Sequence, residues 1–203
     1  MTVIVKQPTI VAFDFDGTLT RGESFFRWLW FVTPWWKFIG YFLRCLPVLL
    51  AYVTRLMSND RAKARVIRIF LRGRMRHPLE VRSRDFATQQ IAKTLRPEAM
   101  ARLRHHQKQG HHCVLVSATL ALYLRPWAEL HGFEAVLATE LGADADGRLS
   151  GQMATPNCYG PEKAVRLKAH FGVDRIFAAY GDSRGDQEML AMAEHGFLKF
   201  NGL

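Results

Sequence analysis

Short apolar segments alternate with longer helical segments over most of the chain after residue 96. Apolar, β-branched runs such as TIVAFDF and HCVLVS predict buried strands, and the segments between such runs have helical periodicity. The predicted elements are strands over 9–15, 112–117, 133–139 and 176–180, helices over 97–109 and 120–131 and from Pro161 and Asp186, a Gly- and Asp-rich turn over 142–151, and a final strand before Phe200. Strands that alternate with helices predict a parallel sheet with helices on both faces. The predicted fold class is therefore α/β, with a Rossmann-like core.

One long segment interrupts this alternation directly after the first strand. Residues 24–95 have a helical pattern throughout, and a chain of 203 residues can hold one domain with a substantial insertion. The predicted helix starts in this segment are Thr33 with Pro34, and Ser58 or Asn59. We expect a core of residues 1–20 and 96–203, with an all-helical cap of residues 21–95.

Polar residues stand where the predicted strands end. In an open parallel sheet, ligands bind beyond the carboxyl ends of the strands, near the switch in strand order. The residues at these ends are Asp14 and Asp16 in FDFDGTLT, Ser117 in LVSAT, Asp182 and Asp186 in YGDSRGDQEML, and Lys163, which opens a helix in YGPEKAVRL. We expect these side chains to converge on one site.

Four converging carboxylates repel one another unless a cation lies among them, and carboxylate oxygens suit Mg²⁺. The metal, a lysine and a serine together form a site for an anion, and phosphate fits best. Gly17 lets the backbone approach closely, and Ser117 and the amide of Ala118, at a predicted helix start, can donate to phosphate oxygens. A carboxylate held against phosphorus is a competent nucleophile, and a second aspartate two residues on can transfer protons.

These motifs resemble the haloacid dehalogenase superfamily of phosphatases, and within it the phosphoserine phosphatase-like branch, whose helical cap is inserted after the first motif. The resemblance covers four motifs in family order: DFDGT, the strand-end Ser117, Lys163, and GDSxxDxxML at 181–190. It implies that Asp14 is the nucleophile that forms an aspartyl-phosphate and that Asp16 is the general acid and base. It also implies that Ser117 and Lys163 hold the phosphoryl group, and that Asp14, the backbone carbonyl of Asp16, and Asp182 bind Mg²⁺, supported by Asp186.

Two departures from phosphoserine phosphatases concern the substrate. Those enzymes carry Ser-Gly-Gly at the second motif and Asn before the last aspartate, whereas this chain has SAT at 117–119 and Gly185. Glu23, nine residues after Asp14, resembles the acid that recognises a substrate amine in that family, and Arg65 is a candidate for carboxylate binding. We expect a phosphomonoesterase, with the substrate left open.

The positive charge of the chain is concentrated in the predicted cap. Between Arg21 and Arg84 there are fourteen Lys and Arg residues against three acids, whereas the rest of the chain has fourteen bases and fifteen acids. The formal net charge of +10 therefore originates in one segment, which indicates a ligand or partner of negative charge.

The first part of the cap, FFRWLWFVTPWWKFIGYFLRCLPVLLAYV at 25–53, contains four of the five tryptophans. A membrane-spanning helix needs about 20 apolar residues, and Lys, Arg and Pro interrupt this stretch, so a simple span is disfavoured. Lys37 and Arg44 are seven residues apart and share a helix face. On the other side we expect Trp35, Phe42, Leu46 and Leu49. This amphipathic pattern suits the core of the cap, a membrane interface or a partner-binding surface.

Three functions remain open at this stage. A Mg²⁺-dependent phosphatase of a small soluble phosphomonoester is favoured. The second is the same chemistry on a phospholipid phosphate, because bacterial phosphatidylglycerophosphate phosphatases of this branch also resemble this chain in their unusually apolar cap. The third, a basic nucleic-acid or membrane binding module with a vestigial site, is disfavoured because every expected catalytic position is filled.

Cysteine usage and the first residues bear on location. Cys45, Cys113 and Cys158 lack disulfide or metal-ligand spacing, which favours a reducing compartment. The sequence MTVIVKQPTIVAF lacks the pattern of a secretory signal. We expect a cytoplasmic protein that contacts the inner face of a membrane peripherally if the cap binds lipid; oligomeric state is left open.

Overall fold

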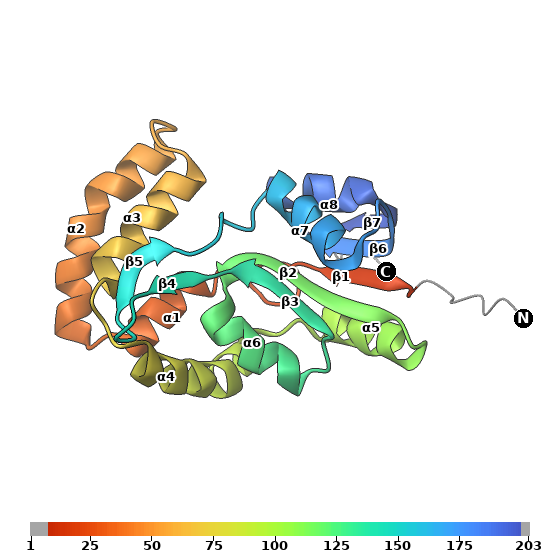
Figure 1. Cartoon of the computed structure of the whole chain (residues 1–203), viewed down its shortest axis with the longest axis horizontal. Coiled ribbons are helices and arrows are strands. Elements are labelled where there is room, and N and C mark those ends of the chain that lie inside the picture. Colours follow the sequence, from red (N-terminus) through yellow and green to blue (C-terminus); the bar gives the residue numbers. More distant parts are fainter. Residues whose placement is uncertain (1–7, 200–203) are drawn as a thin grey trace, which may run out of the picture.

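A five-stranded parallel sheet forms the centre of the protein (Figure 1). The computed structural model describes residues 8–199. The strands, in spatial order, are β3 (Ala135–Thr139), β2 (His112–Leu120), β1 (Ile10–Phe13), β6 (Ile176–Gly181) and β7 (Ala193–Leu198). The prediction of an α/β fold with a parallel sheet is confirmed.

Four helices cover the two faces of this sheet: α5 (Pro97–Lys108), α6 (Ala121–Leu130), α7 (Pro161–Phe171) and α8 (Gln187–Met192). Successive residues of a strand point to opposite faces, and the buried strand β1 shows this alternation. Val11 and Phe13 belong to the apolar cluster that includes α5 and α6. Ile10 and Ala12 belong to the cluster that includes α7 and α8.

Strand order changes direction at β1, which lies in the middle of the sheet. The chain passes from β1 to β2 and β3 on one side and later to β6 and β7 on the other. Phe13, the last residue of β1, pairs with Leu115 on one side and Tyr180 on the other. The residues that follow β1 therefore lie at the switch point, between the carboxyl ends of β2 and β6.

The inserted cap is helical. It consists of α1 (Phe25–Val32), α2 (Trp35–Val53), α3 (Asn59–Leu71), α4 (Arg76–Gln89) and a short 3₁₀ helix, η1 (Ile91–Thr94). Its two linkers pair with each other, because Arg21 N donates to Thr94 O at 2.7 Å and Arg96 N donates to Leu19 O at 2.9 Å. In α1, Trp28 stacks on Tyr123 of α6 at 5.4 Å between ring centroids, which ties this part of the cap to the core.

The predicted turn over 142–151 is instead a β-hairpin that joins the cap. Its strands are β4 (Leu141–Ala143) and β5 (Leu149–Met153). The backbone groups of Leu149 exchange hydrogen bonds of 2.8 Å with Gly73 and Arg74, which follow α3. Asp144 stabilises the tip, since its Oδ1 accepts from the amides of Asp146 and Arg148. The Gly and Asp residues therefore form the hairpin turn, and the strands on either side are very short.

Of the two predicted helix starts in the cap, one is confirmed and the other is wrong. Ser58 caps α3 by accepting from Arg61 N. The expectation for Thr33 is wrong, because Thr33 ends α1 and its hydroxyl accepts from Arg74 Nη1 at 3.1 Å. Pro34, which lacks a side-chain acceptor, takes the cap position of α2.

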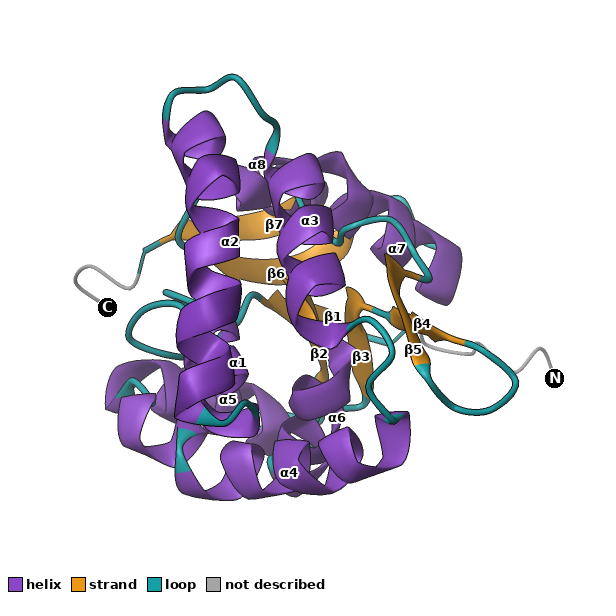
Figure 2. Cartoon of the chain, turned by 90° about the vertical axis from the view of Figure 1, so that its left-hand side faces the viewer, coloured by secondary structure: helices purple, strands orange, loops and turns teal. Residues whose placement is uncertain are grey.

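α2 is apolar apart from Lys37 and Arg44, and Figure 2 shows it side by side with α3. Trp35, Phe42, Leu46 and Leu49 lie on one side of this helix, as their spacing predicted, but that side is only partly covered. Phe42 and Leu49 pack inward, whereas Trp35 and Leu46 are exposed. Among helices in the described part of the chain, α2 is long and apolar enough to cross a membrane by length and composition, a test that some soluble-protein helices also pass.

Candidate active site

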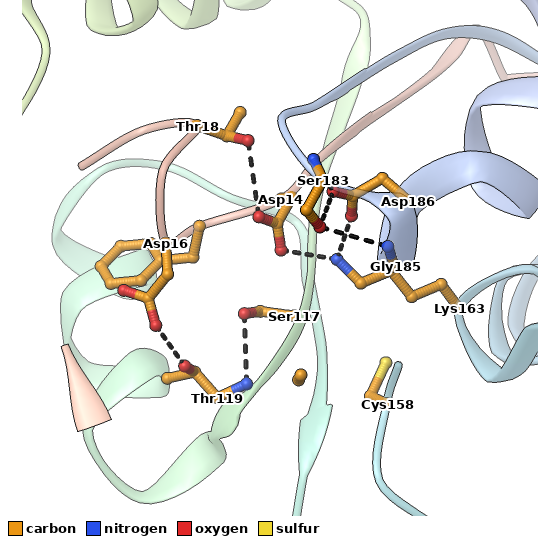
Figure 3. A network of polar contacts seen from close by, with 12 residues as sticks. Asp14, Asp16, Thr18, Ser117, Thr119, Cys158, Lys163, Ser183, Gly185 and Asp186 are labelled. Atoms are coloured by element: carbon orange, nitrogen blue, oxygen red, sulfur yellow. Dashed lines mark hydrogen bonds and ion pairs between the residues drawn. The ribbon is translucent and has the colours of Figure 1, made fainter. Parts of the chain in front are cut away.

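Asp14 follows β1 directly and lies in a buried charge network (Figure 3). Its backbone N donates to Tyr180 O at 2.9 Å, which fixes it beside β6. Lys163 Nζ, from the first turn of α7, donates to Asp14 Oδ1 and to Asp186 Oδ1, both at 2.5 Å. Burial acts to lower the pKa of Lys163, but the two carboxylates hold that pKa above its ordinary value. Lys163 is therefore a fixed cation at the switch point.

Asp186 anchors the loop that follows β6. Its Oδ2 accepts from the amides of Asp182 at 3.2 Å and Ser183 at 3.0 Å, and from the Ser183 hydroxyl at 2.9 Å. Burial acts to raise the pKa of Asp186, but Lys163 and the Ser183 donors hold it below its ordinary value. Both carboxylate oxygens are thus occupied, so Asp186 is suited to positioning Lys163 and the loop.

Asp14, Asp182 and Asp186 form a group that could hold a metal ion. One oxygen from each lies within 4.8 Å of the others. Burial, followed by Asp186, raises the pKa of the half-buried Asp182. Burial also raises the pKa of Asp14 to about 7, against the opposing effect of Lys163. One lysine against three carboxylates leaves surplus negative charge in a buried place, and this donor set fits Mg²⁺.

Gly17 makes the approach of Asp182 possible. Its φ is +82°, and a Cβ at this position would lie 2.1 Å from Asp182 Oδ2. Only glycine combines this left-handed backbone with the necessary space. Gly17 therefore brings the loop after β1 against the loop after β6, which supports a shared cation site.

Asp16 faces the site from the opposite side of the loop. Thr119 Oγ1 donates to Asp16 Oδ2 at 2.6 Å, while Ser24 donates to both Asp16 oxygens at 3.0 Å through its amide and hydroxyl. Burial, followed by the charge of Glu23, raises the pKa of Asp16 to about 6. A carboxyl group whose pKa lies near neutrality is well matched to proton transfer in both directions.

Ser117 and Ala118 lie within β2, which continues to Leu120. Ser117 pairs with Ala138 and Leu120 with Thr139, so two residues between them form a bulge. Ser117 Oγ accepts from Thr119 N at 3.2 Å. The expectation that the Ala118 amide opens a helix is wrong, because α6 begins only at Ala121. The bulge, instead of a helix end, brings both residues to the site.

A cavity of about 340 Å³ connects these residues with the cap. The core contributes Asp14, Asp16, Ser117, Ala118, Thr119, Tyr159, Lys163, Ser183 and Gly185, and the cap contributes Glu23, Phe25, Phe26, Leu49, Tyr52, Asn59, Ala62, Lys63 and Val66. Glu23 thus lies where the sequence placed it, and burial followed by Asp14 raises its pKa. The cap supplies the largely apolar wall opposite the carboxylates of the core.

Lys63 is the cation that the cap presents to this cavity, and sequence reasoning missed it. Its Nζ donates to Asn157 Oδ1 at 2.7 Å and to Ala118 O, and burial lowers its pKa to about 8. Arg65 is exposed and lines a separate groove with Arg68 and Gln152, so the structure does not bring it to this cavity. A usable signal existed: Asn59, Ala62, Lys63 and Val66 have the spacing of one helix face.

The sequence matches the haloacid dehalogenase-like hydrolase family over residues 11–191, and the chain belongs to that family. Protein CicA of Caulobacter vibrioides is 41% identical over 199 residues, which covers 97% of this chain and 88% of that protein. The match includes the loop after β1, the cap and the loop after β6.

Solved structures share the fold at low sequence identity. A Bordetella pertussis protein of unknown function has a TM-score of 0.77 with 22% identity, covering 92% of this chain and 87% of that one. A phosphoserine phosphatase solved as a phospho-aspartyl intermediate analogue has a TM-score of 0.62 with 17% identity, covering 93% and 84%. A probable phosphoserine phosphatase from Vibrio cholerae has a TM-score of 0.66 with 15% identity, covering 91% and 54%. The chain thus has a phosphoserine phosphatase-like fold.

Proposed function

We propose that this protein is a Mg²⁺-dependent phosphomonoester hydrolase that works through an aspartyl-phosphate on Asp14. The observation that carries the proposal is the pairing of two different carboxyl groups in one cavity. Asp14 is held by Lys163 beside the candidate metal ligands, whereas Asp16 is held by Thr119 and Ser24 away from them. The related fold solved as a phospho-aspartyl intermediate analogue supports the same chemistry.

In the first step, an Asp14 oxygen attacks phosphorus, and a P–O bond forms as the bond to the leaving oxygen breaks. Asp16 gives its proton to the leaving oxygen. Lys163 and Ser117 hold the phosphoryl oxygens in position. In the second step Asp16 takes a proton from water, which attacks phosphorus, and inorganic phosphate leaves with Asp14 restored.

The chain supplies a metal site that suits this reaction. Asp14, Asp182 and the carbonyl oxygen of Asp16 are the proposed direct ligands, and Asp186 supports them through the loop after β6. Bound Mg²⁺ would neutralise charge on the phosphate oxygens. Gly17 and Asp186 keep Asp182 in place for that role.

The proposed substrate is a small phosphomonoester whose leaving group occupies the cap side of the cavity. Glu23 and Lys63 offer charges of opposite sign there, while Arg65 lies in another groove and is dropped from the specificity set. A phospholipid phosphate, such as phosphatidylglycerophosphate, is the second candidate. It is favoured by the apolar wall of Phe25, Phe26, Leu49 and Val66.

A cytoplasmic location belongs to the proposal. Its support is that Cys45, Cys113 and Cys158 are free and buried, as is usual where thiols stay reduced. A nucleic-acid partner is not part of the proposal.

The first experiment is hydrolysis of a generic aryl phosphate with Mg²⁺ and with a chelator. Asp14→Asn is expected to abolish hydrolysis, and Asp174→Asn, at a highly exposed side chain, serves as the matched control. Absence of wild-type hydrolysis across metals and pH would contradict the enzymatic proposal. Salt-sensitive binding to RNA or DNA in the same preparation would then favour a binding module.

The second experiment is a substrate panel of phosphoserine, sugar phosphates, nucleotides and phosphatidylglycerophosphate. A preference for a soluble ester, lost in Lys63→Met, would support the first substrate class. A preference for the lipid phosphate over its soluble headgroup would instead support a phospholipid phosphate as the substrate.

A further inference from the structure

One side of α2 carries a continuous row of exposed apolar side chains. We call this the outer row: Trp36, Ile39, Leu43, Leu46, Leu50 and Val53. The spacing alternates between three and four residues, so the row follows a single face of the helix. Exposed fractions within it include 60% at Trp36 and 65% at Leu50, and reach 75% at Val53.

The opposite face of α2 is already used. Phe38 and Tyr41 each contact the Phe70 ring of α3 at 5.3 Å between centroids, and Cys45 and Val48 are buried. Apart from Lys37 and Arg44, α2 carries only apolar side chains, tyrosines and a glycine, and a helix that is apolar nearly all round is normally covered in a protein core or in a membrane. Within residues 8–199, only the inner side of α2, which packs against α3, is covered.

The outer row runs along almost the whole of α2. From residue 36 to 53 it extends about 26 Å at 1.5 Å per residue, and Trp35 and, past the end of the helix, Leu56 are also exposed. Contiguous apolar patches of this kind mark interaction sites, whereas single exposed apolar residues are normal. The exposed apolar residues Val81, Leu130 and Val165 lie on three different helices and form no such row.

Cations border the row on α2 itself and on the loop that follows it. These exposed bases are Lys37, Arg44 and Arg55. Within residues 8–199, none of them has a carboxylate at ion-pair distance. The nearby acids are otherwise engaged: Asp60 accepts from Asn157, and Glu80 pairs with Arg76.

We propose that the outer row of α2 is a docking surface for an anionic lipid bilayer. Apolar side chains enter the headgroup boundary, tryptophans lie at its edge, and the bordering bases attract anionic headgroups. A second copy of this chain is a poorer occupant, because a two-fold interface would place the same bases opposite one another. A nucleic acid would use the bases and leave the outer row in water.

In this proposal, α2 lies on the membrane surface and does not cross the bilayer. Crossing would require α2 to leave α3 and expose the aromatic contacts of its inner face. Leu49 and Tyr52 of the same helix also line the catalytic cavity. A bilayer docked on the outer row would therefore lie about one helix diameter, roughly 10 Å, from that cavity.

The test is co-sedimentation of the full chain with vesicles of phosphatidylcholine, with and without phosphatidylglycerol, at low and at physiological salt. Wild type is expected to bind the phosphatidylglycerol vesicles, more weakly as salt rises. A variant with Trp36→Ser, Leu43→Ser and Leu50→Ser is expected to bind at least about tenfold more weakly, a loss of about 1.4 kcal/mol. None of these three residues lines the catalytic cavity.

A matched control replaces exposed apolar side chains by serine elsewhere. The variant with Val81→Ser, Leu130→Ser and Val165→Ser removes three similarly exposed apolar side chains from other helices and is expected to bind like wild type. Lys37→Glu with Arg44→Glu, at exposed positions that tolerate polar residues, is expected to abolish the preference for phosphatidylglycerol. Circular dichroism of each variant checks folding.

Three results would overturn the docking surface: no vesicle binding by wild type, equal binding by the outer-row and control variants, or a wild-type dimer that the outer-row variant dissociates. The proposed hydrolysis fails separately. Aryl phosphate hydrolysis without vesicle binding would refute the docking surface and leave the enzyme standing. Vesicle binding without hydrolysis under any metal would refute the proposed hydrolysis and leave the docking surface standing.

Discussion

At Gly17, a left-handed backbone lies directly against the carboxylate of Asp182. The Gly17 φ of +82° and the 2.1 Å between a built Cβ and Asp182 Oδ2 leave no room for any side chain. Gly17→Ala is expected to displace Asp182 and to lower kcat/KM at least about 100-fold, since misplacement by 1 Å can cost that much. Titration of Mg²⁺ against activity should show weaker metal binding in the same variant.

The control for Gly17 is Gly110→Ala. Gly110 also has a left-handed backbone, with φ of +72°, but nothing lies within 4 Å of its built Cβ. The Gly110→Ala variant should lose about 1 kcal/mol of stability from backbone strain and retain activity. Equal activity in the two variants would show that contact with Asp182 does not matter.

The buried charge of Lys63 makes the folded protein less stable than an apolar side chain at this position would. Burial lowers its pKa from 10.5 to about 8. Between these values the unfolded chain holds a proton that the folded chain has lost, so stability rises with pH in that window. At pH 7 both states are charged, and the folded state carries the full cost of the buried charge.

Lys63→Met is therefore expected to raise the free energy of unfolding at pH 7 by about 1–3 kcal/mol, after the lost hydrogen bonds are counted. The gain should shrink at about pH 10, and kcat/KM should fall about tenfold with the lost cation. Urea unfolding at the two pH values measures the first effect. Lys168→Met, at an exposed lysine paired with Asp174, should show no such pH dependence.

The choice between Lys63 and Arg65 shows what a sequence leaves undecided at this scale. Two residues apart on one helix, they face different directions, and only the docking of α3 decides which one enters the cavity. Asp14, Asp16 and Lys163 were easier to place, because strand ends and a helix start fix their positions. Ser24 and Thr119, which hold Asp16, carried no separate signal in the sequence.

Among the elements, the β4–β5 hairpin ties the carboxyl-terminal part of the chain to the cap. Gly151 has φ of +76°, and a Cβ there would lie 2.7 Å from Arg72 Cβ and 3.2 Å from Arg72 Cα. Because backbone atoms of α3 and its end cannot give way easily, Gly151→Ala should push the hairpin from the cap. We expect a loss of about 1–3 kcal/mol of stability, measured by thermal unfolding.

Gly147→Ala tests the same hairpin without the clash. Its φ is +75°, and nothing lies within 4 Å of its built Cβ. It should lose less stability than Gly151→Ala and keep full aryl phosphate activity. If the two variants lose equal stability, the contact with Arg72 contributes nothing beyond backbone strain.

Element type was predictable where helical periodicity was regular, as in α5 and α7, or where an apolar, β-branched run was unbroken, as in β1. The hairpin escaped prediction because β4 has three residues and β5 five, too few to show alternation beside a turn rich in Gly and Asp. The bulge in β2 escaped because it depends on pairing with β3. For α2, burial of one face depends on α3, so the sequence could not show that the outer row stays exposed among residues 8–199.

At the scale of the whole molecule, charge at the switch point links segments that are far apart in the chain. Asp14 follows β1, Lys163 opens α7 and Asp186 follows β6. Burial raises the pKa of Asp14 from 3.8 to about 7, although Lys163 opposes it. Between these values the folded chain holds a proton that the unfolded chain has lost, so without metal the stability falls as pH rises through this window.

Asp14→Asn removes this titration and is expected to reduce the loss of stability between about pH 4 and pH 7, a shift worth at most about 4 kcal/mol. Mg²⁺ should raise the unfolding temperature of wild type above pH 7, because a ligand that binds the folded state stabilises it by mass action. The variant should gain much less. Thermal unfolding with Mg²⁺ and with a chelator measures both effects, with Asp174→Asn behaving like wild type. An equal Mg²⁺ response in Asp14→Asn would remove Asp14 from the metal site, even if that residue proved essential for hydrolysis.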